Sequence, residues 1–255
     1  MAGIWAIGEA NGGAPSRLTL ELATLARTLA EAAGMDSTTV VLGDGAAAAA
    51  QEVARYAPRV LAVEVSGTGE GPAAGTAAPI VAALVEQHAP DHLLIAASPD
   101  GKDLAGALMA LLGLPVLANA SAVEWADGPQ VEMSTFGGRL VTRSTFDGPR
   151  GILLVRPASV TAEPAPQAGS VETVEPQAAS QLATVRVTER VEEAGATASI
   201  EEARIIVGGG RGVGSADGFR QVEALAEALG GAVGATRAVV DAGWIGYGQQ
   251  IGQTG

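Results

Sequence analysis

Cysteine is absent from this chain, and histidine nearly so. The lack of cysteine excludes disulfides, thiolate zinc sites and thiol nucleophiles. A Ser/His/Asp hydrolase or a histidine-rich metal centre would have to be built around His88 or His92, the only two histidines. Both lie in EQHAPDHLL, where a helix end meets a strand, so we expect their side chains to be solvated. We therefore predict no catalytic residue and no metal site.

Positive charge and long apolar segments are also scarce. The 15 Lys and Arg stand against 28 Asp and Glu, for a formal net charge of −13. Such a surface repels phosphate backbones, so we expect neither nucleic acid nor an anionic membrane as partner. No apolar stretch reaches membrane-spanning length without a charge, glycine or proline, which argues against insertion into a membrane. The first residues, MAGIWAIGEANG, lack the cationic region of a signal peptide, which predicts a cytoplasmic protein.

Aromatic residues make up only 3% of the 255 residues, whereas 47% are hydrophobic. The interior must therefore be built from Val, Leu, Ile and Ala, which suits helices packed closely on a sheet. The length is sufficient for two domains.

Strand and helix signals alternate through the first half of the chain. The runs VVLG and LLIAA are continuously apolar, as in strands of a parallel sheet that is covered on both faces. Between such strands, Ser16 and Gly34 bound a predicted helix with one apolar face. That face carries Leu18, Leu22, Leu25 and Leu29.

The pattern changes in the middle of the chain. The segments QVEMSTFGG, RLVTRSTFDG and ILLVRPASV are short and predict antiparallel or edge strands that complete the sheet. From Ala162 the sequence is rich in Pro, Ala, Gln and Glu, without a helical or strand period, and predicts a connector. TVRVTERV resembles one more short strand. We place the domain boundary so that residues 1–192 form a first α/β domain and residues 193–255 belong to a second.

A glycine-rich turn, VGGGRGVGSADGF, opens the second domain. It follows the apolar run ARIIVG and precedes a predicted helix that Ser215 or Asp217 could cap. The expected apolar face of this helix carries Phe219, Val222, Leu225 and Leu229.

Two standard phosphate-binding fingerprints fail in this turn. No lysine follows the glycines as GxxxxGK[ST] requires, and no register of GxGxxG fits them. The glycines can still present backbone N–H groups to an anion at a helix N-terminus, and Arg211 could clamp a diphosphate. The alternative is a plain strand-to-helix turn with a solvated Arg211.

Three segments, GGGRGVGSADGF, GATRAVVDAGWI and QQIGQTG, occur in this order and together resemble the flavin-binding domain of electron transfer flavoprotein alpha subunits. GKDLAGALMALLGLPVLANASAV and GPRGILLVRPASV resemble the amino-terminal domain of that family. The resemblance implies a nucleotide-hydrolase-like parallel-sheet domain with late antiparallel strands, followed by a doubly wound flavin-binding domain. It also implies strands beyond Gly255, so we expect an incomplete second domain and poor FAD binding by this chain alone.

The resemblance further implies which residues contact FAD. Arg211 and Gly212 would lie by the phosphates, Thr236 would touch the cofactor, and Arg237 would lie over the isoalloxazine ring. The remaining implied contacts are Gln250, Ile251, Gly252, Gln253 and Thr254, along the flavin and its ribityl diphosphate. Read alone, each could be an ordinary surface or turn residue. The stretch IGYG departs from the proline-containing form usual in the family, which puts the shape of this loop in doubt.

The function implied is that of a bacterial electron carrier rather than an enzyme. FAD would lie at the interface of a heterodimer with a beta subunit that holds AMP. Electrons would pass from flavin dehydrogenases, such as the acyl-CoA dehydrogenases of fatty acid beta-oxidation, to a membrane quinone oxidoreductase. The alternative is an NAD- or NADH-using oxidoreductase, including an electron-bifurcating relative, with Asp217 and Asp241 as the available proton-transfer groups. A third hypothesis places a nucleotide in the first domain.

Overall fold

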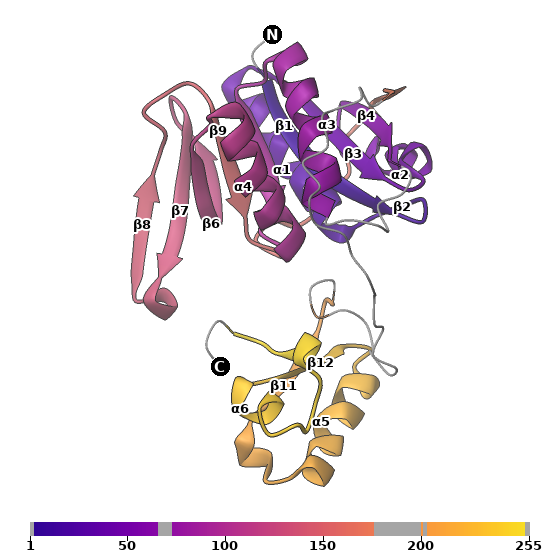
Figure 1. Cartoon of the computed structure of the whole chain (residues 1–255), viewed down its shortest axis with the longest axis vertical. Helices are drawn as coiled ribbons and strands as arrows, with labels where there is room; N and C mark the ends of the chain where they lie inside the picture. The colour runs from indigo at the N-terminus through magenta and orange to yellow at the C-terminus, as the bar shows by residue number, and fades with distance from the viewer. Residues whose placement is uncertain (1–2, 66–72, 176–199, 201–202, 253–255) are drawn as a thin grey trace. The chain divides into compact units, whose positions relative to one another are not determined.

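The computed structural model describes residues 3–65, 73–175, 200 and 203–252 (Figure 1). The chain divides into two compact units, Met1–Thr188 and Glu189–Gly255. The predicted boundary after residue 192 and the predicted strand TVRVTERV lie outside the described residues, so both stay predictions.

The first unit is built on one large sheet with helices on both faces. Its strands are β1 (Gly3–Asn11), β2 (Ala14–Pro15), β3 (Asp36–Gly43), β4 (Arg59–Glu64), β5 (His92–Ala96), β6 (Val116–Trp125), β7 (Pro129–Thr135), β8 (Leu140–Ser144), β9 (Gly151–Val155) and β10 (Ser170–Thr173). Its helices are α1 (Arg17–Ala33), α2 (Ala46–Val53), α3 (Ala73–His88), α4 (Pro99–Leu112) and the short 3₁₀ helix η2 (Phe136–Gly138). The strand order is β10-β4-β3-β1-β5-β9-β6-β7-β8, and β2 pairs with β1. The predicted α/β class is confirmed.

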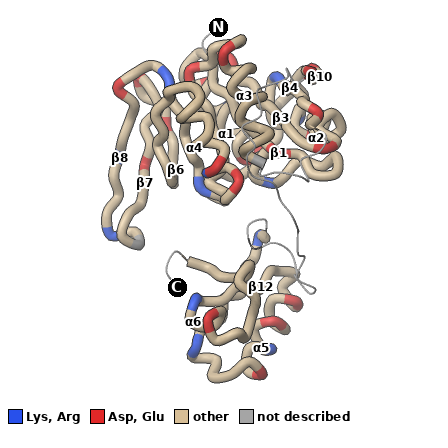
Figure 2. Tube along the Cα trace, viewed as in Figure 1, with Lys and Arg blue, Asp and Glu red and all other residues tan. Residues whose placement is uncertain are grey.

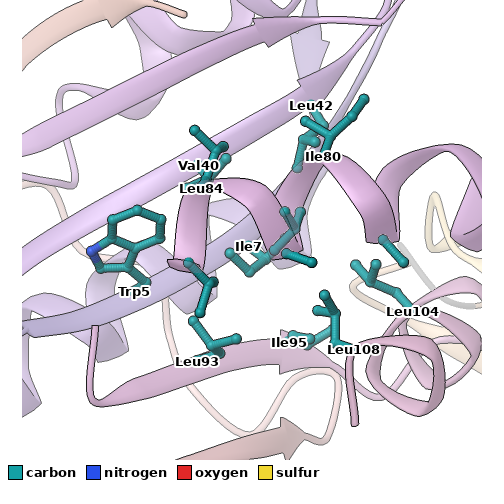
Figure 3. Packing of buried hydrophobic residues seen from close by; sticks show 14 of the residues in the cluster. Trp5, Ile7, Val40, Leu42, Ile80, Leu84, Leu93, Ile95, Leu104 and Leu108 are labelled. Carbon is teal, nitrogen blue, oxygen red and sulfur yellow. The ribbon is translucent and has the colours of Figure 1, made fainter. Parts of the chain in front are cut away.

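Alternate residues of the central strands face two separate helical layers. Trp5 and Ile7 of β1 belong to the cluster that α3 and α4 cover, whereas Ile4 and Ala6 pack against α1. Figure 3 shows Ile80 and Leu84 of α3 and Leu104 and Leu108 of α4 over this core. The continuously apolar runs are therefore parallel strands buried on both faces, as predicted.

The first helix forms where its capping residues predicted. The Ser16 Oγ accepts a hydrogen bond from the Thr19 N–H at 3.2 Å, and Gly34 ends the helix with a φ of 66°, which favours glycine. Leu22, Leu25 and Leu29 are buried against the sheet.

Two predictions about the sheet were wrong. β9, from the segment ILLVRPASV, is a buried parallel strand between β5 and β6 rather than an antiparallel or edge strand. Its five residues are all buried, which a run of Ile, Leu and Val accounts for. The predicted connector contains β10, which pairs in parallel with β4. β10 is short and at the sheet edge, so it shows no apolar alternation. The antiparallel prediction is confirmed for β7 and β8.

The second unit has a small parallel sheet of β11 (Ile206–Gly209) and β12 (Ala232–Ala235). Its helices are α5 (Ala216–Ala228), α6 (Arg237–Val240) and the 3₁₀ helices η3 (Arg211–Val213) and η4 (Tyr247–Gln249). Phe219, Ala226, Val233, Ala235 and Val239 form its core.

Ser215, not Asp217, caps α5, because its Oγ accepts from the Gly218 N–H at 3.0 Å. The predicted apolar face of α5 was too wide. Leu225 and Leu229 are 51% and 50% exposed, since the small sheet is contacted by the narrower stripe that includes Phe219 and Ala226.

Candidate functional site

Three segments that are distant in sequence meet at the carboxyl end of the small sheet. The Thr236 N–H donates to the Gly209 carbonyl at 3.0 Å, which joins the ends of β12 and β11. The Ile251 N–H donates to the Ala235 carbonyl at 2.8 Å, and Ala235 forms a parallel bridge with Gln250. Ligands of open parallel sheets bind beyond the carboxyl ends of the strands. One edge of the small sheet therefore brings together the glycine turn after β11, the Thr236–Arg237 pair after β12 and the segment around Ile251.

Glycines in these strands allow the segments to approach closely. A Cβ added at Gly234 would lie 2.8 Å from Ile251 Cγ2, and one at Gly208 would lie 2.8 Å from Ile251 Cδ1. A Cβ at Gly210 would lie 3.6 Å from the Thr236 side chain. The Ile251 side chain therefore packs on the backbone of both strands, and the glycine turn runs beside Thr236.

The glycine turn itself is open to solvent. Arg211 begins η3 and is exposed, and a Cβ added at Gly212 would meet no atom within 4 Å. Gly214 has a φ of 92°, a conformation that favours glycine. No ion pair to Arg211 occurs within residues 203–252. The turn therefore presents a guanidinium group beside accessible backbone.

Thr236 and Arg237 begin α6 next to this turn. The Thr236 side chain makes no capping hydrogen bond, so its hydroxyl is not used by the helix. The Arg237 Nε lies 3.4 Å from the Asp241 Oδ2, but these side chains are 59% and 64% exposed. Exposed pairs of this kind contribute little, so Arg237 remains available to an anionic group. Figure 2 shows the basic residues near α6 and the acidic residues along α5.

The last predicted contacts are only partly described. Gln250 and Gly252 lie at the edge, and Gly252 has a φ of 88°. Gln253 and Thr254 lie outside the described residues, so their roles stay predictions. The prediction from sequence did not select Tyr247, which begins η4 just before this segment and is 77% exposed. The feature of the sequence that could have drawn attention to Tyr247 is its position between two glycines in IGYG.

The expectation of two solvated histidines was wrong for His92. Its side chain is 4% exposed, stacks on Phe146 at 5.8 Å between ring centroids and meets Trp125 edge-on at 5.6 Å. Burial lowers the pKa of His92, while the nearby Asp91 raises it to a smaller extent. The hydrophobic residues that follow it in HLLIA already indicated a buried strand. His92 therefore has a packing role.

The N-termini of α2 and α4 in the first unit, like that of α1, are satisfied by the protein's own side chains. The Glu64 carboxylate accepts from the Gly45 N–H at 3.0 Å and from the Ala47 N–H at 2.8 Å, at the start of α2. The Ser98 Oγ accepts from the Gly101 N–H at 3.0 Å, at the start of α4. A phosphate would have to displace these groups, which disfavours a nucleotide at the start of α2 or α4. The residues just before α3 lie outside the described part of the chain, so the hypothesis stays untested there.

Among the described residues, no group of three or more His, Asp or Glu side chains is arranged to hold a metal ion. Within the same residues, no helix is long and apolar enough to cross a membrane.

Two successive parts of the chain match known families. Residues 4–203 match the electron transfer flavoprotein domain, and residues 199–255 match the electron transfer flavoprotein FAD-binding domain. The chain is 39% identical over 259 residues to the electron transfer flavoprotein subunit alpha of Mycobacterium tuberculosis (strain ATCC 25618 / H37Rv), covering 100% of this chain and 79% of the relative. It is 37% identical over 251 residues to that of Mycobacterium leprae, covering 97% and 76%. For the subunit of Syntrophomonas wolfei the identity is 32% over 259 residues, covering 100% and 80%.

Proposed function

The chain belongs to the electron transfer flavoprotein family as an alpha subunit, and on this premise we propose that it holds FAD at the carboxyl edge of β11 and β12. The FAD-binding domain implies the cofactor, and the alpha subunit implies a beta-subunit partner. When bound, FAD supplies the electron-transfer chemistry, so the protein itself needs no general acid or base. The chain is an electron carrier, and its own residues bind and orient the cofactor.

The convergence of three motifs at one edge is the observation that carries this proposal. Arg211 stands exposed beside the open backbone at Gly212, which suits a diphosphate that needs both a guanidinium clamp and N–H donors. The Thr236 side chain lies beside the same turn and is not used by a helix cap. Gln250 is joined to the end of β12 and supplies an amide at the same edge. These residue types fit the polar parts of FAD.

Arg237 has a different role in the proposal. It lies over the isoalloxazine ring, where a cation stabilises negative charge and so raises the reduction potential of the flavin. Its solvent-exposed pair with Asp241, at 3.4 Å, can be exchanged for a cofactor contact at small cost.

The electron path is part of the proposal. The carrier receives electrons from flavin dehydrogenases such as acyl-CoA dehydrogenases in fatty acid beta-oxidation, and passes them to a membrane quinone oxidoreductase. The first domain, proposed as residues 1–192, is a scaffold that contacts a beta subunit holding AMP, and residues 193–255 supply the FAD contacts. The protein works in the cytoplasm. Support for these points comes from family membership.

The oxidoreductase alternative gains less support from the site. It requires a proton-transfer group, yet Asp217 is 90% exposed and lies 3.6 Å from Arg220, while Asp241 pairs with Arg237. These are ordinary surface ion pairs.

Co-expression with the beta subunit tests the proposed function. The purified complex should show a flavin absorption spectrum that bleaches when an acyl-CoA dehydrogenase and its substrate are added. Bleaching by NADH without any dehydrogenase would favour the oxidoreductase alternative. A colourless complex that does not take up added FAD would contradict the proposal.

A further inference from the structure

A cavity lies in the first unit, at the amino-terminal edge of its sheet. Its volume is about 630 Å³, within the range of about 300–1,000 Å³ that is typical of small-molecule sites. Its walls are the last turns of α1, the first residues of β3 and β4, and the segment from Ala165 to Gln167. The proposed FAD site involves none of these residues.

The segment from Ala165 to Gln167, called the strap below, forms the fourth wall of the cavity. Main-chain hydrogen bonds hold it on both sides. The Ala165 N–H donates to the Arg55 carbonyl at 2.7 Å, and the Gly169 N–H donates to the Ala54 carbonyl at 2.7 Å. Before the strap, the Glu163 N–H donates to the Thr24 Oγ1 of α1 at 3.1 Å. These bonds hold the wall in place, so the cavity has a defined shape.

Ser37 is one of the residues that line the cavity, and its hydroxyl group has no hydrogen-bond partner among the described residues. The residue is 6% exposed, and its Oγ is buried. Leaving such a group unpaired costs about 1–3 kcal/mol. A ligand atom that accepts a hydrogen bond would remove this cost.

Arg27 brings a buried positive charge to the same cavity. Its side chain is 12% exposed, and its guanidinium group donates to two neutral acceptors, the Tyr56 carbonyl at 3.2 Å and the Glu163 carbonyl at 3.0 Å. The nearest carboxylate, of Glu31, is 3.9 Å away and 69% exposed. A buried charge is costly unless it is paired, so the cavity favours an anion near Arg27.

Another wall of the cavity carries a second guanidinium group. Arg59 lines the cavity and pairs with Glu172 at 2.8 Å, with side chains 40% and 57% exposed. Such an exposed pair contributes little, so Arg59 can turn to a ligand. The carboxylates of Glu31 and Asp36 also line the cavity, and both residues are exposed. The buried groups thus favour an oxyanion, and the exposed carboxylates favour hydrogen-bond donors elsewhere on the ligand.

We propose that this cavity binds a small organic oxyanion, a carboxylate or a phosphate ester that also carries hydroxyl or amino groups. Ser37 and Arg27 hold the oxyanion in the interior, Arg59 closes on it from another wall, and the two exposed carboxylates contact its donor groups. The first unit then has a ligand site of its own in addition to its role as a scaffold.

Calorimetric titration of the full chain with inorganic phosphate and, separately, with acetate tests this proposal, with sodium chloride as the control for ionic strength. Saturable binding of phosphate identifies the phosphate-ester class, and saturable binding of acetate identifies the carboxylate class. Saturable binding of neither anion overturns the proposal.

Variants locate the anion. Ser37→Ala and Arg59→Gln should each weaken the binding about tenfold, the effect expected for one charge-assisted hydrogen bond. Thr39→Val is the matched control, because the Thr39 Oγ1 is also buried without a partner among the described residues but does not line the cavity. It should leave the affinity unchanged. Equal affinities in all variants, or an equal loss in the control, would place the anion elsewhere.

A second readout tests the premise about Ser37 without any ligand. Removal of an unpaired buried hydroxyl should leave the melting temperature of the Ser37→Ala chain unchanged or raise it. A clear decrease would show that the hydroxyl has a structural partner, and the inference would fail.

Discussion

The two units differ in how much of their polar backbone and side chains they expose. The first unit buries its central strands on both faces and closes the N-termini of α1, α2 and α4 with its own Ser16, Glu64 and Ser98. The second unit has a sheet of two strands, leaves Arg211 exposed beside open glycines, and exposes Leu225 and Leu229 by about half. Ser215 also caps α5, so the difference lies in the exposed turn at Arg211 and in Thr236, whose side chain makes no capping hydrogen bond. Buried strands and capped helices suit a scaffold, whereas an exposed cation beside open backbone suits the binding of a cofactor.

The largest expected effect is on the free energy of unfolding, when a buried leucine of the first unit is replaced by alanine. Leu61 is 0% exposed within the first unit, so Leu61→Ala should lower the free energy of unfolding by about 2–5 kcal/mol, measured by denaturant titration. Leu140→Ala, at a residue that is 48% exposed in the same unit, should change it by less than about 0.5 kcal/mol. Equal effects would contradict the assignment of the core.

Loss of the exposed arginine of the glycine turn should affect cofactor binding and not stability. Arg211→Ala removes a charge-assisted bond worth about 1.5–3 kcal/mol, so FAD affinity in the complex with the beta subunit should fall about tenfold or more. Arg220→Ala is the control, since Arg220 is on α5 and 79% exposed but outside the site. Unchanged affinity for Arg211→Ala would make Arg211 a plain turn residue.

Arg237→Ala should lower the reduction potential of bound flavin, because a positive charge near the ring is lost. Redox titration of the complex measures this change, and Arg237→Lys, which keeps the charge, should restore most of it. If the potential does not move, the proposed place of Arg237 is wrong.

Loss of the N-terminal cap of α5 should have a smaller effect, on the stability of the second unit. Ser215→Ala should destabilise that unit by about 1 kcal/mol, since the Gly218 N–H loses its 3.0 Å acceptor. Hydrogen exchange of α5 amides measures the change, and Ser215→Asp should retain protection. Equal protection in the alanine variant would mean that the cap is not needed.

The smallest expected effect is a pH dependence of the first unit. Because burial lowers the pKa of folded His92 below its ordinary value of 6.5, the unfolded chain binds more protons as the pH falls below 6.5. Stability should therefore be full above pH 6.5 and decrease as the pH falls toward the folded pKa. Denaturant titration between pH 7 and pH 5 measures this slope, and His92→Phe should reduce it. An unchanged slope in the variant would assign the effect to other groups.

Sequence patterns predicted the helices and strands that local signals determine in both units. They failed where contacts between distant segments determine the structure. The cap at Ser16 and the apolar runs sufficed for α1 and the parallel strands. The pattern could not show that β9 enters between β5 and β6, because strand order depends on distant contacts. The interpretation also missed the burial of His92, although the apolar residues after it indicated a buried strand; the contacts of its ring with Trp125 and Phe146 could not be predicted.

The sequence predicted the residues of the candidate site, whose contacts with FAD stay predictions, but not the geometry that brings them together. Motif order pointed to Arg211, Thr236 and Arg237, while their meeting depends on the Thr236 and Ile251 hydrogen bonds to neighbouring segments. The packing of Ile251 on Gly208 and Gly234 could not be predicted, because it joins segments separated by many residues.

The position of the FAD diphosphate in a crystal structure of the complex with the beta subunit tests the central claim most directly. We expect the diphosphate at the carboxyl edge of β11 and β12, within hydrogen-bond distance of the Arg211 guanidinium group and the backbone at Gly212. A diphosphate bound in the first unit, or one without contact to Arg211, would contradict the division between a closed scaffold and an open cofactor site.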